Sequence, residues 1–416
     1  MMRIRHVVFN LGVGGTERAA QNLAIGTARR GHITEVVALQ GGPREEVLRS
    51  ADIQVRIVGQ EASGSVAELS DVDALIIHSH GIHADFVSEI IYRSGNPKIA
   101  EVNVFSEPSP WMDDVDVSFQ LSPWAHWLYV QRGGDETRSS TLPYPVDNKG
   151  FFKDKLAGQA FRKEYGIPQD AIVVGRIGQP YEGKWSPWLV ESFAELHQVG
   201  YPLHLLLVGA PASVSESVHN YVLEGTATDI TKVIGDDRLR GAYNAMDVFA
   251  HSAQQGESFG YVLAEASLCE VPVVTMATPW ADNSQGWVAG PSGSVAITPR
   301  GFTRSLEQLI STKTGERELK GKHARQHVLD SFATDSVVEQ LLAVLSGDRE
   351  RTALPSRSEL EMPMYRGFDY PQFLRLIARS PNSGIGGPLS RQAPWLSYFR
   401  DFLNSRGISR HLLRRS

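Results

Sequence analysis

The sequence contains a single cysteine, Cys269, so no disulfide can form within the chain. Such scarcity is typical of proteins kept in a reducing cytoplasm. No run approaches the roughly 18 consecutive apolar residues that a membrane-spanning helix needs. The start of the chain also lacks a signal peptide, because Val7-Val8-Phe9 is followed at once by Asn10 and glycines. We therefore expect a cytoplasmic protein that does not cross a membrane.

An excess of positive charge is missing too. The 41 Lys and Arg against 47 Asp and Glu give a net charge of −6, which argues against a chain-wide nucleic-acid surface. The segment 391–416 differs, with six arginines against one aspartate among aromatic residues. It fits either a helix on an anionic membrane surface or, the favoured interpretation, a helix docked on the protein with its arginines in water.

The chain of 416 residues is long enough for two domains of ordinary size. Short apolar segments alternate with helical ones, as in doubly wound parallel sheets. We expect strands at 6–11, 34–39, 55–58, 74–78, 98–103, 117–121, 171–177, 203–209, 247–251 and 271–275. Helices are expected at 17–30, ended by Gly31, and at 187–199 and 237–246.

The segment 141–147 separates the two series, because its two prolines fix a rigid bend. We expect Rossmann-like domains at 1–160 and 161–346, facing across a cleft at their strand ends. A linker and helical extension follow at 347–416, with short helices at 371–379 and 394–404.

Glu257 and Glu265 bracket a glycine-containing turn that leads into an apolar helix start. If most of this span is helical, the two carboxylates stand roughly 12 Å apart along it. That length suits the distance between the two sugars of a nucleoside diphosphate-sugar. Backbone N–H groups of the helix start between them would suit the diphosphate. The alternative is a helix with an acidic first turn, which is common.

Arg176 and Lys184 lie between an expected strand end and the next helix. A leaving diphosphate gains negative charge, which arginine meets bidentately and lysine as a point charge. Such residues on a loop are most often solvated, and the position at a strand end favours binding. In the first domain, Gly14 and Gly15 lie in a turn where backbone can approach a phosphate. This turn lacks the third glycine of the dinucleotide fingerprint, so an unliganded tight turn is equally compatible with it.

His78, His80 and His83 resemble the zinc-binding run of metallo-β-lactamase-like hydrolases, although Ile82 stands where that run has aspartate. We favour no metal here, with His80 facing the cleft to bind substrate and the other two serving in packing or at the surface. Two acidic pairs are interpreted as solvated carboxylates rather than a magnesium site: Asp71, Asp73, Asp114 and Asp116.

Residues 3–345 resemble the retaining glycosyltransferases of family 4, which have the GT-B architecture. The resemblance rests on motifs in the family's order: GGTER at 14–18, HSH at 78–80, GR…K at 175–184, LLLVG at 205–209 and the run DVFAHSAQQGESFGYVLAEA at 247–266. The two glutamates separated by seven residues are the most specific of these.

The resemblance implies that the second domain binds a nucleoside diphosphate-sugar and the first faces the acceptor. Glu257 would contact the donor sugar and Glu265 the ribose, with Arg176 and Lys184 on the diphosphate and His80 near the transferred sugar. The remaining donor contacts would come from Gly14, Gly15, Ser258, Phe259, Gly260, Tyr261, Val233 and Ile234. The family uses no metal or cofactor, the nucleotide sugar being a co-substrate.

Three segments depart from the family pattern. Tyr144-Pro145 replaces Asn-Gly at the hinge, 279–283 replaces a Gly-Gly…Glu loop, and 347–416 extends beyond the usual end. In GT-B enzymes the last helix returns to the first domain, and either tail helix would serve. The expected function is transfer of a hexose or similar sugar to a carbohydrate or lipid-linked acceptor with retention, at the inner membrane face if the basic segment binds lipid. A nucleotide-sugar epimerase, a metal hydrolase and a silent sugar-nucleotide binder are the alternatives.

Overall fold

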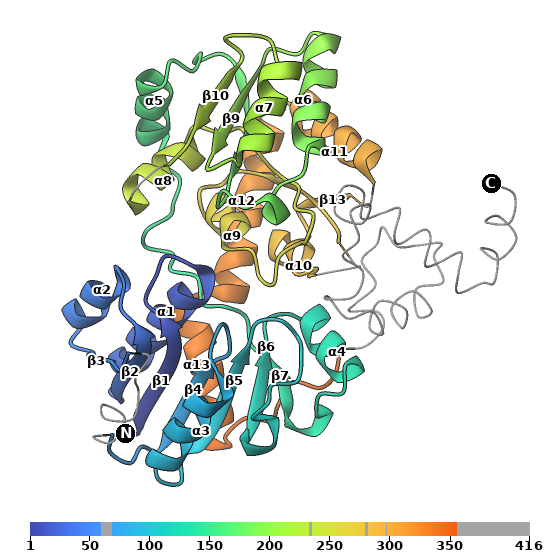
Figure 1. The fold of residues 1–416 in the computed structure, drawn as a ribbon. Coiled ribbons are helices and arrows are strands. Elements are labelled where there is room, and N and C mark those ends of the chain that lie inside the picture. The colour runs from blue at the N-terminus through green and yellow to red at the C-terminus, as the bar shows by residue number, and fades with distance from the viewer. Residues whose placement is uncertain (60–68, 233–234, 279–281, 297, 356–416) are drawn as a thin grey trace, which may run out of the picture. The chain divides into compact units, whose positions relative to one another are not determined.

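The computed structural model describes residues 1–59, 69–232, 235–278, 282–296 and 298–355. The chain folds into two compact units (Figure 1). The first comprises Met1–Asp147 and the segment that starts at Ser331, and the second begins at Asn148 and ends at Asp330. The chain therefore leaves the first unit at Asp147, directly after the proline-containing bend, rather than after residue 160.

The first unit is built on a seven-stranded parallel sheet in the order β3-β2-β1-β4-β5-β6-β7. Its strands are β1 Arg3–Asn10, β2 Ile33–Gln40, β3 Gln54–Ile57, β4 Ala74–His78, β5 Lys98–Asn103, β6 Val117–Gln120 and β7 Ser139–Thr141. Its helices are α1 Gly15–Arg29, α2 Arg44–Ser50, α3 Ala84–Arg93, α4 Pro123–Gln131 and α13 Thr334–Ser346, with 3₁₀ turns η2 Met112–Asp114 and η3 Glu136–Arg138. The strand order reverses between β1 and β4, so the loops after these strands lie where open α/β sheets bind ligands.

The apolar strands of this sheet are covered on both faces. Val7 and Ile77 pack with Phe86 of α3 on one face, while Val8 packs with Ala24 of α1 on the other. Burial on both faces is why these strands read as continuous apolar runs in the sequence. Helix α1 ends as predicted, with Gly31 at φ +83° just beyond its last turn.

The second unit holds a six-stranded parallel sheet in the order β10-β9-β8-β11-β12-β13. Its strands are β8 Ile172–Ile177, β9 Leu203–Val208, β10 Ala227–Ile230, β11 Val248–His251, β12 Val273–Met276 and β13 Ser294–Ala296. Its helices are α5 Lys155–Glu164, α6 Trp188–Val199, α7 Ala212–Tyr221, α8 Asp236–Asn244, α9 Tyr261–Leu268, α10 Gln285–Ala289, α11 Pro299–Ser311 and α12 Thr314–Phe332, with the 3₁₀ turn η4 Glu182–Lys184. Here the order reverses between β8 and β11.

The predicted doubly wound sheets are confirmed, with most strands at the expected residues. The sequence did not predict β7, β10 and β13, which are short edge strands and carry polar residues. An edge strand is paired on one side only, so it needs no long apolar run.

Helix α13 packs against α1 in the first unit. A Cβ at Gly26 would overlap the Val338 side chain, so the absent side chain lets the two helices approach closely. The returning helix is therefore α13, whereas the helices expected at 371–379 and 394–404 lie outside the described residues. Within the described part of the chain, no helix combines the length and apolarity needed to span a bilayer.

Candidate active site

Glu257 lies in the loop between β11 and α9, beside the reversal of strand order in the second sheet. This loop turns at Gly256 and Gly260, whose φ angles are +67° and +104°. A Cβ at Gly256 would overlap the Asp282 carbonyl oxygen, so this position requires glycine in space as well as in conformation. Because α9 begins only at Tyr261, the span from Glu257 to Glu265 is a loop followed by helix and not one continuous helix. The estimate of roughly 12 Å along a helix therefore does not apply.

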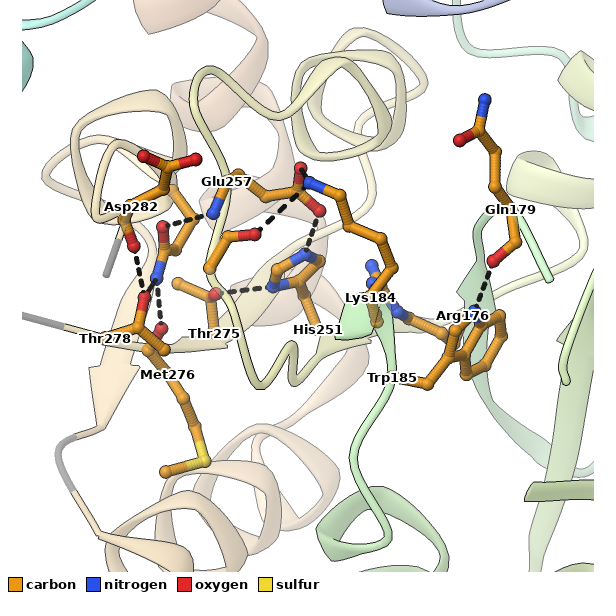
Figure 2. A network of polar contacts seen from close by, with 12 residues as sticks. Arg176, Gln179, Lys184, Trp185, His251, Glu257, Thr275, Met276, Thr278 and Asp282 are labelled. Carbon is orange, nitrogen blue, oxygen red and sulfur yellow. Dashed lines mark hydrogen bonds and ion pairs between the residues drawn. The ribbon is translucent and has the colours of Figure 1, made fainter. Parts of the chain in front are cut away.

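The Glu257 carboxylate is held from both sides (Figure 2). Lys184 Nζ lies 2.7 Å from Oε2, and His251 Nε2 lies 3.1 Å from Oε1. The Glu257 backbone N–H donates to Gln285 Oε1 at 3.1 Å. Burial would raise the pKa of Glu257, but Lys184, His251 and Arg176 outweigh it and hold the pKa well below its usual range. Glu257 is therefore an anion at neutral pH in a preset orientation.

His251 orients Glu257, a role that the sequence did not reveal. Its Nδ1 lies 2.9 Å from Thr275 Oγ1, so both ring nitrogens are occupied. A carboxylate only accepts hydrogen bonds, so Nε2 carries the proton and Nδ1 accepts from the threonine hydroxyl. Burial, and then the charge of Arg176, lowers the pKa of His251 from its ordinary 6.5 to about 4. The imidazole is therefore neutral at pH 7.

We expect this histidine to make stability depend on pH. Its pKa is lower in the folded than in the unfolded chain, so its stabilising contribution is complete above about pH 6.5 and is lost as pH falls toward 4. One such group contributes a slope of up to about 1.4 kcal/mol per pH unit. Urea unfolding of His251→Gln between pH 7 and 4.5 should show a shallower loss than the wild type. His219→Gln, an exposed control on α7, should lose stability as steeply as the wild type. Equal slopes in the wild type and both variants would contradict this role of His251.

Arg176 ends β8 as a buried cation, only 1% exposed. Its guanidinium lies 5.2 Å from the Trp185 ring centroid and 5.8 Å from that of Phe249, and Nη2 donates to the Lys184 carbonyl at 2.8 Å. Within the described residues, Nε and Nη1 have no hydrogen-bond partner. Burial lowers the pKa of Arg176 to about 10, so it still carries its charge at pH 7. A buried cation with two unpaired donor atoms is a site that an anion would complete.

The η4 turn places Lys184 beside Glu257. Besides Glu257, its Nζ contacts the Gly256 carbonyl oxygen at 3.3 Å. Burial acts to lower the pKa of Lys184, and Glu257 more than offsets this, so the pKa is raised. Lys184, which is predicted to bind the diphosphate, is thus ion-paired with Glu257, which is predicted to bind the donor sugar.

Hydrogen bonds join the loop after β12 to the loop that carries Glu257. Ser258 Oγ donates to Asp282 Oδ2 at 2.7 Å, and Thr278 Oγ1 donates to the Asp282 carbonyl at 2.5 Å. Gln285 Nε2 donates to Thr278 Oγ1 and to the Met276 carbonyl, both at 2.7 Å. Side-chain hydrogen bonds therefore hold this loop against the Glu257 loop, whereas 279–281 lie outside the described residues.

Glu265 lies in the second turn of α9 and is 4% exposed. Its Oε2 accepts a hydrogen bond from Tyr243 Oη of α8 at 2.8 Å. Phe259 is buried and its ring meets that of Tyr261 edge to face. The helix start predicted between the two glutamates thus exists, with Gly260 as its N-cap. Val233 and Ile234, the expected contacts to the nucleobase, lie outside the described residues.

In the first unit, Gly14 caps α1 and Gly15 is the helix's first residue. A Cβ at Gly14 would overlap the Glu17 carboxylate, so the two groups lie close together in this turn. Tyr144 Oη lies 3.2 Å from Thr16 Oγ1, which ties this turn to the segment where the chain leaves the unit. The aromatic residue at the hinge therefore supports the glycine turn.

The three histidines at 78–83 do not converge. His78 is buried, with Nε2 3.2 Å from His6 Nδ1, and His80 and His83 are exposed. Among the described residues, no group of three or more His, Cys, Asp or Glu is placed to hold a metal ion. Two of the acidic residues support strands instead, since Asp73 accepts from Arg3 N and Asp116 from Ile99 N.

The two units, each a parallel sheet with helices and one reversal of strand order, are those of the GT-B class. Solved structures agree in fold. HepE from Anabaena, solved with UDP and glucose, matches at a TM-score of 0.67 and 17% identity, covering 83% of this chain and 100% of that one. WaaG, a glycosyltransferase of lipopolysaccharide biosynthesis, matches at 0.58 and 16% over the same shares.

Within this class, residues 168–312 match the family described as glycosyl transferases group 1. The capsular polysaccharide glycosyltransferase CapM of Staphylococcus aureus is 27% identical over 223 residues, 52% of this chain and 57% of CapM. The D-inositol 3-phosphate glycosyltransferase of Stackebrandtia nassauensis is 31% identical over 155 residues, 34% of each chain. These matches span at most about half the length of these relatives. Most of the second unit therefore matches the glycosyl transferases group 1 model, in agreement with the resemblance seen in the sequence.

Proposed function

We propose that this protein transfers a hexose or similar sugar from a nucleoside diphosphate-sugar to a carbohydrate or lipid-linked acceptor, with retention of configuration. The observation that carries this proposal is the group of Arg176, Lys184 and Glu257 at the strand reversal of the second sheet. Lys184 is ion-paired with the Glu257 carboxylate, and the charge of the buried Arg176 helps to lower the pKa of Glu257. Two donor atoms of Arg176 have no hydrogen-bond partner among the described residues. CapM and HepE support the same chemical class.

In the proposed reaction, the bond between the sugar C1 and the diphosphate oxygen breaks as the acceptor oxygen bonds to C1. Arg176 and Lys184 stabilise the charge that develops on the leaving diphosphate, an effect commonly of several kcal/mol. A diphosphate oxygen takes the acceptor proton on the same face, and Glu257 holds hydroxyls of the donor sugar. Lys184 exchanges part of its contact with Glu257 for the phosphate.

The remaining donor contacts follow the family resemblance. Glu265, oriented by Tyr243, binds the ribose hydroxyls, and the backbone N–H groups of Ser258, Phe259, Gly260 and Tyr261 face the diphosphate. The first unit would contribute Gly14 and Gly15 to the phosphates and His80 to the transferred sugar. Val233 and Ile234 would contact the base, and no metal or cofactor is needed. Peripheral membrane contact through 391–416 is part of the same proposal.

A ligand-dependent stability measurement tests the nucleotide assignment. We expect UDP to raise the thermal midpoint, because a ligand at 100 times its dissociation constant adds about 2.7 kcal/mol. UDP is the first probe because HepE was solved with it. The shift should persist in EDTA and be absent with uridine, which has no diphosphate. If no nucleoside diphosphate among UDP, GDP, ADP and TDP shifts the midpoint, the proposal is wrong.

Product analysis separates the rival activities. UDP-sugar consumption that needs an acceptor and releases UDP identifies a transferase. Conversion of the donor to another UDP-sugar without an acceptor would identify an epimerase. Binding without either reaction would identify a silent sugar-nucleotide binder.

A further inference from the structure

Phe105 is an exposed aromatic residue on the loop that follows β5 in the first unit. Its side chain is 42% exposed, whereas the flanking Val104 and Ser106 are buried. The Phe105 ring lies against that of His80, 5.4 Å between centroids and at 69°. Both residues follow the carboxyl ends of neighbouring strands, β4 and β5, at the edge where open α/β sheets bind ligands.

The loop that presents Phe105 is fixed rather than loosely exposed. Ser106 has φ +55°, an uncommon conformation for a residue other than glycine. Its N–H donates to Asn103 Oδ1 at 2.9 Å, and Asn103 Nδ2 donates to the Glu107 carbonyl at 2.8 Å. A local conformation of higher energy persists only where the surroundings impose it, and such residues gather at ligand sites.

Arg132, at the end of α4, holds the same loop from a second element. Its Nη1 donates to the carbonyls of Phe105 at 2.9 Å and Ser106 at 3.3 Å, and lies 3.6 Å from Glu107 Oε1. These bonds fix the backbone while leaving the Phe105 ring and the Glu107 carboxylate exposed. The backbone of this loop is already ordered, so less conformational entropy is lost when a ligand binds.

We propose that Phe105, with His80 and Glu107, forms a platform for one pyranose ring of the acceptor. A pyranose has an apolar face of C–H groups, which an aromatic ring covers, and a rim of hydroxyls, which an imidazole and a carboxylate bind. The combination of one exposed ring with flanking acceptor and donor groups suits this ligand better than a lipid chain, which needs no polar partners. The inference rests on the proposed function and assigns Phe105 to the acceptor rather than the donor.

The test uses saturation-transfer NMR on the full chain loaded with UDP. The probes are the methyl α-pyranosides of glucose, galactose and mannose. The variants are Phe105→Ala, Phe105→Trp and the control Tyr92→Ala, which removes an aromatic ring that is 81% exposed at the far end of α3. We expect at least one probe to bind the wild type and the control equally. Phe105→Ala should weaken the binding of that probe about tenfold, and Phe105→Trp should retain its binding.

The outcomes that overturn the inference are distinct from failure of the proposed function. Equal probe binding by Phe105→Ala, or no probe bound by the UDP-loaded wild type, would overturn the acceptor platform while leaving the nucleotide site intact. Weaker UDP binding by Phe105→Ala would move Phe105 to the donor side and also overturn it. Failure of UDP to bind the wild type would instead contradict the proposed function.

Discussion

Glu257→Gln should lower turnover at least about 100-fold while UDP binds at least as tightly as in the wild type. The loss of turnover follows from the proposed function, in which the Glu257 carboxylate contacts the donor sugar and one preorganised group is worth roughly 3 kcal/mol. The retained affinity follows from the 2.7 Å pair with Lys184. Without the carboxylate, Lys184 no longer divides its charge between Glu257 and the diphosphate.

The glutamine is chosen because it keeps the shape of the loop. Its amide oxygen still accepts from His251 Nε2, so the fold around Glu257 should persist. Release of UDP from UDP-glucose measures turnover, and calorimetry measures UDP affinity. Glu182→Gln is the control, an exposed carboxylate on the same turn as Lys184. Near-normal turnover in Glu257→Gln, or loss of UDP binding with it, would contradict the assigned role.

Arg176→Met should abolish most UDP affinity, at least about 100-fold, without loss of thermal stability. Burying an incompletely paired charge costs solvation free energy, which an apolar side chain of similar length does not lose, and Glu257 keeps its ion pair with Lys184. Trp185 and Phe249, which flank the guanidinium, would pack against the methionine as readily. The anion, however, would lose the buried donors that the unliganded protein leaves without a partner among the described residues.

Arg162→Met is the matched control, for which we expect the opposite result. Arg162 Nη2 lies 2.7 Å from Asp247 Oδ2, and Nε donates to the Ala245 carbonyl at 2.8 Å. Removing this satisfied arginine should lower the thermal midpoint and leave UDP affinity unchanged, because it breaks structural bonds away from Glu257. If Arg176→Met destabilises the chain as much as Arg162→Met does, the buried cation serves the fold and not the ligand.

Local sequence patterns predicted the sheets well, for a physical reason. A parallel strand buried on both faces is almost entirely apolar, as in β9 with five Leu and Val residues beside His204, so it is visible without knowledge of its neighbours. The edge strands β7, β10 and β13 were not predicted, because their stability comes from pairing on one side with a strand distant in the chain. The packing of α13 on α1, which brings Val338 against Gly26, likewise joins segments far apart in the chain that no local pattern links.

The candidate site likewise contains residues that local patterns indicated and contacts that they did not. The sequence by itself marked two local motifs, one with Arg176 and Lys184 and the other with Glu257 and Glu265, and the family resemblance linked them. Only the tertiary structure decided that Lys184 pairs with Glu257, that His251 orients this carboxylate and that Arg176 is buried between two rings. Ion pairs and desolvation depend on distances between segments far apart in the chain, and those distances exist only once strands β8 and β11 lie side by side.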